Sequence, residues 1–119
     1  MQRTRILLGQ LPPILADLVR QLLNEATEVC HTTSTAVADL IAATDESNAD
    51  VVVAVLGEGV SAADVSLALS RQHPGIALIV LDERGRAGAR YIDGCVDSAT
   101  DDLSPHTLRR LVRPPDTFR

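Results

Sequence analysis

The chain of 119 residues is 45% apolar and 23% charged and has a net charge of -5, which indicates one acidic globular domain with a core of its own. All 11 basic residues are arginine. The absence of lysine excludes Schiff-base chemistry and the phosphate-binding loop of P-loop NTPases, because both need a lysine amine.

The sequence also indicates where the protein works. Cys30 and Cys95 are too few for a disulfide framework, and we interpret them as small buried residues in a reduced setting. The apolar run at Ile6 stops at Gly9, and no run approaches the roughly 20 apolar residues of a membrane helix. Broad nucleic-acid binding needs many Lys and Arg side chains to neutralise phosphates. We therefore expect a cytoplasmic protein that contacts no membrane and, by this chain alone, no nucleic acid.

The first part of the chain alternates between strand and helix patterns. A short apolar strand is predicted from Arg5 to Gly9. Pro12-Pro13 then begins a helix in which apolar pairs recur every four residues. A second strand is predicted from Glu28 to Thr32, and a helix capped by Ser34 is predicted from about Thr35 to Thr44.

The middle of the chain carries the most apolar segments. The run from Val51 to Leu56 does not alternate, which is typical of a central strand covered on both faces. Ser61 caps a helix that continues to about Arg71, and Pro74-Gly75 ends it. Ile76 to Leu81 is a second strand of fully buried character.

The pattern weakens after Leu81. Asp82 to Gly88 contains no large apolar residue, which predicts a loop or hairpin connection in place of a helix. A strand is predicted from Ala89 to Val96. Ser104-Pro105 begins the last helix, and Pro114-Pro115 ends it.

These elements predict an α/β fold. Alternating strands and helices favour a three-layer sandwich with a mostly parallel, five-stranded sheet and helices on both faces. The flavodoxin-like strand order suits this length, and its ligand crevice lies at the carboxyl ends of the strands. The fourth helix is expected to be reduced to a loop or hairpin. The domain is expected to span residues 1–113, with residues 114–119 as a tail or the start of a linker.

Four segments carry a resemblance to a known family: Arg5-Ile-Leu-Leu-Gly-Gln-Leu-Pro12, Ala49-Asp-Val-Val-Val-Ala-Val-Leu56, Ile76 to Asp82 and Leu103-Ser-Pro-His-Thr-Leu108. They are similar to the first, third and fourth strands and to the entry to the last helix of bacterial response-regulator receiver domains. The resemblance covers nearly the whole chain. It implies the flavodoxin-like fold and a role in two-component signal transduction.

The resemblance also implies a phosphotransfer site whose residues are missing here. In the family, an aspartate after the third strand is phosphorylated while carboxylates hold magnesium. The acidic pair of the family falls on Gly9 and Gln10, the phosphoacceptor falls on Val55, and the switch hydroxyl falls on Asp82. The lysine of the family has no counterpart. We therefore expect a pseudo-receiver without enzyme activity, cofactor or metal.

Other residues of the sequence admit different interpretations. Glu58, Asp82 and Glu83 would rebuild a magnesium site, but no spacing motif links them, and we favour solvated loop acids. Asp82 would alternatively act as a permanent negative charge that mimics a phosphorylated state. Gly57-Glu-Gly59 would cradle an anion, although a tight turn explains it without a ligand. The spacing of the remaining cysteines and histidines is not that of a metal site: Cys30, His31, His73, Cys95 and His106.

Three arginines, Arg109, Arg110 and Arg113, cluster on the last helix. They form either its solvated face, where they complement the helix dipole, or a contact surface for another protein. A homodimer through this helix is one form of such contact, and the weakly patterned segment after Leu81 would leave further apolar surface uncovered.

Three functions follow from these observations. The first is a phosphorylation-independent regulatory domain that acts through protein–protein contacts. The alternative is a small-ligand or nucleotide-binding module with its crevice at Gly9, Gln10, Gly57 and Asp82. The third is the receiver half of a longer regulator that continues beyond Arg119.

Overall fold

The structure is a computed structural model, which describes residues 4–9, 13, 17, 27–31, 37–56, 59–82, 84, 86–102 and 105–112. Within these residues the strands and helices follow the order β1 (Thr4–Leu8), β2 (Thr27–His31), α2 (Val37–Ser47), β3 (Val51–Ala54), α3 (Ala62–Gln72), β4 (Ala77–Leu81), β5 (Gly88–Ile92), β6 (Cys95–Thr100) and α4 (Pro105–Val112). Pro13 and Asp17 also have helical backbone, and the rest of the helix predicted after Pro12 lies outside the described residues.

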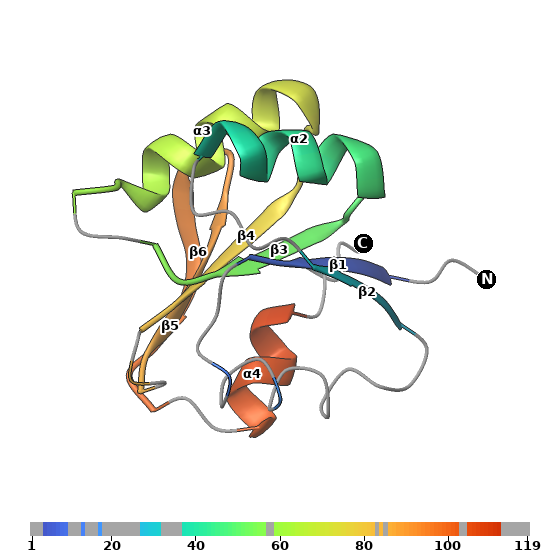
Figure 1. Ribbon diagram of the computed structural model, residues 1–119. Coiled ribbons are helices and arrows are strands. Elements are labelled where there is room, and N and C mark those ends of the chain that lie inside the picture. Colours follow the sequence, from blue (N-terminus) through green and yellow to red (C-terminus); the bar gives the residue numbers. More distant parts are fainter. Residues whose placement is uncertain are drawn as a thin grey trace, which may run out of the picture.

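The strands form one mixed sheet in the order β2-β1-β3-β4-β5-β6. β1 to β4 are parallel, whereas β5 is antiparallel to β4 and β6 is antiparallel to β5. Helices α2 and α3 cover one face and α4 covers the other, so the predicted three layers are confirmed (Figure 1). The arrangement fits a flavodoxin-like fold. The prediction of five strands was wrong by one, since β6 adds a second antiparallel strand.

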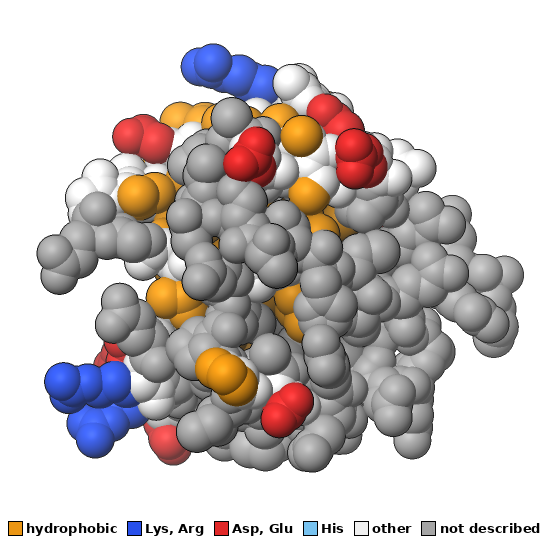
Figure 2. Space-filling view, viewed as in Figure 1, with side chains coloured by type: hydrophobic (Ala, Val, Ile, Leu, Met, Phe, Trp, Pro, Cys, Tyr) orange, Lys and Arg blue, Asp and Glu red, His pale blue; other side chains and the backbone are white. Residues whose placement is uncertain are grey.

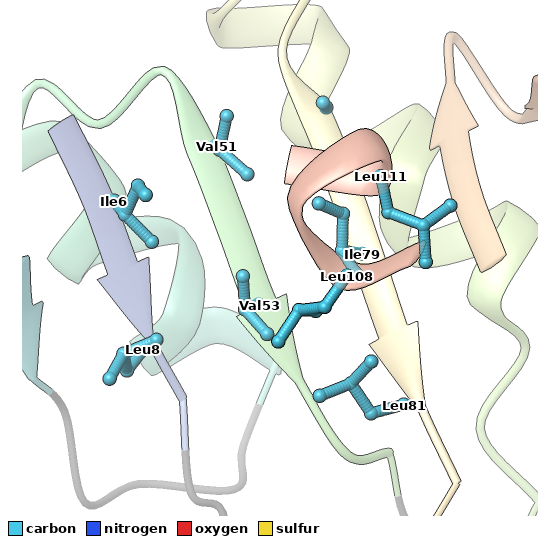
Figure 3. Close-up of a cluster of buried hydrophobic side chains, with 9 residues drawn as sticks. Ile6, Leu8, Val51, Val53, Ile79, Leu81, Leu108 and Leu111 are labelled. Carbon is cyan, nitrogen blue, oxygen red and sulfur yellow. The ribbon is translucent and has the colours of Figure 1, made fainter. Parts of the chain in front are cut away.

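The central strands are buried on both faces, as their unbroken apolar runs predicted. Successive side chains of a strand point to opposite faces, so Val53 packs on the α4 side and Val52 packs on the side of α2 and α3. Leu108 and Leu111 of α4 point toward Val53 and Ile79 of the sheet (Figure 3). The core therefore consists of two apolar clusters separated by the sheet.

The helices begin and end close to the predicted residues. The hydroxyl of Ser61 accepts a hydrogen bond from the backbone N of Asp64 at 3.3 Å, which confirms the predicted cap of α3. Helix α2 ends at Ser47, three residues later than predicted. The predicted caps Ser34 and Ser104 and the prolines Pro114 and Pro115 lie outside the described residues, whereas Pro74-Gly75 follows the end of α3 at Gln72 as predicted. No helix in the described part of the chain is long and apolar enough to cross a membrane.

The single strand predicted from Ala89 to Val96 was wrong, because the chain reverses within it. Asp93 has a φ of 53° and Gly94 a φ of 82°, and an Asp-Gly pair suits a hairpin turn with two positive φ angles. The chain therefore forms the β5–β6 hairpin (Gly88–Thr100). No helix lies among the described residues between β4 and β5. This confirms the prediction of a loop or hairpin connection in place of a helix.

β6 forms the outer edge of the sheet, and most of its side chains are exposed. The predicted burial of Cys95 was wrong, because this residue follows the turn at the sheet edge. Val96 is 57% exposed, and Leu67 on neighbouring α3 is 44% exposed. Val96 and Leu67 therefore leave exposed apolar side chains beside the β5–β6 hairpin.

Gly94→Ala is expected to lower the free energy of unfolding by more than Gly75→Ala. Both glycines have a φ of 82°, at which a Cβ atom costs about 1–2 kcal/mol. A Cβ at Gly94 would also overlap the side chain of Leu67, whereas nothing lies within 4 Å of a Cβ at Gly75. Denaturant unfolding of both variants measures the difference. Adding Leu67→Ala to Gly94→Ala should reduce it, and equal losses from both glycine variants would contradict docking of the turn on α3.

Candidate functional site

The structure brings three of the four predicted site positions to one edge of the sheet. Gly9 follows β1, Val55 follows β3 and Asp82 follows β4, and these three strands are parallel neighbours. Gln10 lies outside the described residues. The carboxyl edge where an open α/β sheet holds its ligand is therefore formed by a glycine, a valine and an aspartate.

Gly9 is buried against the end of β3. Its backbone N donates a hydrogen bond to the carbonyl of Val53 at 2.8 Å. A Cβ atom built at Gly9 would lie 2.9 Å from Cβ of Ala54 and 3.6 Å from Cδ1 of Leu40. Because the first distance is too short for two carbon atoms, this packing requires glycine. The acidic side chain of an active receiver would have no room at this position.

Val55 and its neighbour Leu56 extend the core to the same edge. Val55 is half-buried and packs against the cluster under α4. Leu56 packs against the opposite cluster, under α2 and α3. The valine has no oxygen that a phosphoryl group could be attached to. The two residues after β3 therefore add apolar side chains to the clusters on both faces of the sheet.

Asp82 is exposed after β4. Its backbone N donates a hydrogen bond to the carbonyl of Ala87 at 2.9 Å and closes the turn between β4 and β5. Glu58 and Glu83, the other two acids of the weighed magnesium site, lie outside the described residues. Among the residues that the structure describes, no three His, Cys, Asp or Glu side chains are grouped so that they could hold a metal ion.

The described residues of the candidate anion-binding loop and the described histidine side chain have structural roles that need no ligand. Gly59 has a φ of 79° and open space around it, so its backbone conformation explains this glycine. Gly57 lies outside the described residues. His73 at the end of α3 pairs through Nε2 with Oδ1 of Asp45 in α2. This histidine therefore joins two helices.

The predicted arginine surface is described in part. The Arg110 side chain is exposed on α4, while the side chains of Arg109 and Arg113 lie outside the described residues. On the face shown in Figure 2, the described basic side chains form two separate groups, with acidic and apolar side chains between them. The described residues of this face therefore do not form one continuous basic patch.

Arg90 in β5, which no sequence pattern indicated, is bonded to two other elements. Its side chain is only 11% exposed and forms an ion pair with Asp97 of β6. Its Nε atom donates to Oδ2 of Asp97 at 2.7 Å, and its Nη1 atom donates to the carbonyls of Arg110 and Leu111 at 3.3 and 3.1 Å. A guanidinium group at these carbonyls also complements the negative end of the α4 dipole.

The tip of the same hairpin contacts the helix on the other face. The backbone N of Gly94 donates to Oγ of Ser66 at 3.0 Å, and Ser66 is fully buried in α3. The Asp-Gly turn was the one sequence signal that could have located this contact. Nothing in the sequence indicated that a serine of α3 would receive it.

No protein-family model and no curated protein matches the chain. Among solved structures, the chain is similar to the crystal structure of a CheY-like protein, TadZ, from Pseudomonas aeruginosa. The TM-score is 0.53 and the sequence identity is 21%, with 66% of this chain and 68% of that chain covered. At this identity the likeness concerns the fold, and it supports the receiver-like architecture that the sequence patterns predicted.

Gly9→Ala is expected to lower the free energy of unfolding by about 1–3 kcal/mol, the usual cost of forcing an extra methyl group into a packed core. The added Cβ would collide with Cβ of Ala54. Denaturant unfolding of Gly9→Ala, Ala54→Gly and the double variant measures the effect. The double variant should lose less stability than the two single variants together. Strict additivity would contradict the close contact.

Proposed function

We propose that this chain is a receiver-type regulatory domain that acts through protein–protein contacts and without phosphorylation. Its similarity to a CheY-like fold supports the receiver-type assignment. The absence of lysine and the valine at the phosphoacceptor position support the loss of phosphotransfer. A fold that lacks the chemistry of its usual site can still function through contacts made by its surface.

The close contact between Gly9 and Ala54 is the observation that carries this proposal. A degenerate site in which only a side chain had changed would keep the space for a metal and a phosphoryl group. Here the backbone of β1 approaches β3 so closely that a single Cβ atom does not fit. The same contact counts against the small-ligand alternative at Gly9 itself, where Ala54 and Leu40 leave no room for a further atom.

The wild-type chain is expected to form no phosphoryl adduct when incubated with a small phosphodonor and magnesium. Val55→Asp should also form none, because the neighbouring Gly9 offers no carboxylate for the metal. Intact-protein mass spectrometry measures the adduct. Thermal unfolding with a phosphoryl analogue and magnesium tests binding without transfer.

A phosphoryl adduct on the wild-type chain that depends on magnesium would overturn the proposal. A saturable rise in melting temperature with a nucleotide or metabolite, without any adduct, would instead favour the small-ligand alternative. These outcomes separate the two candidate functions.

We place the protein contact on α4 at Arg110, whose side chain is exposed, with Arg109 and Arg113 as its neighbouring arginines in the sequence. Arg110→Glu should weaken capture of the partner from the source cell or, if the partner is a second copy, dimer formation in sedimentation experiments. Arg71→Glu is the matched control, because Arg71 is an exposed arginine at the end of α3. Equal loss from both variants would indicate a general charge effect and contradict a surface on α4.

A further inference from the structure

The β5–β6 hairpin contacts a helix on each face of the sheet. Its tip bonds to α3 through Gly94 and Ser66, and its middle bonds to α4 through Arg90. Figure 1 shows α3 and α4 on opposite sides of the sheet at the end where the hairpin lies. One two-stranded element thus has polar attachments to both outer layers.

Helix α4 depends on its contacts with the rest of the domain. It has 8 residues, and a helix of this length is unstable in isolation. Leu108 and Leu111 anchor it in the core. The carbonyls of Arg110 and Leu111 lie in its last turn, where helical donors run out, and Arg90 supplies an N–H to both.

The position of the Arg90 guanidinium depends in turn on β6. Asp97 holds it from the neighbouring strand, and the β5–β6 register shifts between Arg90 and Tyr91, beside this pair. A displacement of β6 would therefore carry Asp97 away from the guanidinium and disturb the donors at the end of α4. The contact with α4 needs the two strands to keep their relative position.

The contact on α3 fixes the other end of the hairpin. Ser66 is fully buried, and its hydroxyl is the acceptor for the N–H of Gly94. Without that acceptor, the N–H would lose its partner in a part-buried contact, which is unfavourable. The positive φ angles of Asp93 and Gly94 define the shape of the turn. The docked tip therefore determines how the two strands approach the sheet.

We propose that the β5–β6 hairpin is a latch that couples α3 to α4 across the sheet. When the tip is docked on Ser66, Arg90 and Asp97 are aligned and α4 is held; when the tip is displaced, the hold on α4 is weakened. The inference concerns the fold itself and does not depend on the proposed function. Because coupling is reciprocal, a change at α4 must also loosen the tip.

Native-state hydrogen exchange, measured by NMR on the full chain, tests the latch. Ser66→Ala is expected to accelerate exchange of the amides of Leu108 and Leu111 about tenfold, because local opening no longer has to break a docked tip. The amides of Leu40 and Thr44 in α2 are the internal reference and should not change. Ser70→Ala is the matched control, since the Ser70 hydroxyl donates to the carbonyl of Leu67 within α3.

Arg90→Lys tests the coupling from the other end. Lysine keeps the charge but loses the planar fork that joins Asp97 to the carbonyls of α4. This variant should accelerate exchange at α4 and also at the Gly94 amide. In the double variant with Ser66→Ala, exchange at α4 should be no faster than in Arg90→Lys alone. If Ser66→Ala does not fold, the response of Gly94 to Arg90→Lys decides the question.

Results of three kinds would overturn the latch. The first kind is the lack of any response to a single substitution: unchanged exchange at α4 in folded Ser66→Ala, or unchanged exchange of the Gly94 amide in Arg90→Lys. The second is independent, multiplying effects of the two substitutions in the double variant, which would mean that the two contacts are not coupled. The third is equal acceleration in α2 and α4, which would report a general loss of stability.

Discussion

Burial of the central strands on both faces is the constraint on which the rest of the structure depends. β1, β3 and β4 carry apolar side chains toward both sides of the sheet, so a helical layer is needed on each side. Leu108 and Leu111 meet this need from α4, and Leu40, Val65 and Leu69 meet it from α2 and α3. The short α4 is consequently part of the core, and its position matters for the stability of the whole domain.

The same packing continues into the edge where a receiver would hold its phosphoryl group. Gly9 lets β1 lie against Ala54, while Val55 and Leu56 extend the two apolar clusters beyond β3. Among the described positions of this edge, Gly9, Val55 and Leu56 contribute apolar packing, and Asp82 contributes an exposed carboxylate. Described polar side-chain contacts lie elsewhere, at Arg90, at Ser66 and between His73 and Asp45.

The sequence predicted those elements whose patterns are local. The continuous run in β3 and the Ser61 cap of α3 were sufficient to place these elements, and the resemblance directed attention to Gly9, Val55 and Asp82 at the carboxyl edge. The β5–β6 hairpin was missed because β6 is mostly exposed and its sequence has no apolar pattern typical of a buried strand. Only Asp93-Gly94 marked the turn. The lack of room at Gly9 and the bonds of Arg90 arise from residues distant in sequence, which no local pattern contains.

The β5–β6 hairpin also affects how this side of the domain can move. Helices packed through apolar stripes can shift against a sheet while keeping most of their contacts. The hairpin is held by directed hydrogen bonds at Ser66 and at a guanidinium that is 11% exposed, so a small shift breaks whole bonds. A mostly buried arginine is costly to leave without acceptors. Opening this side of the sheet therefore requires Arg90 and Asp97 to exchange these bonds for new ones, with water or with the molecule that opens it.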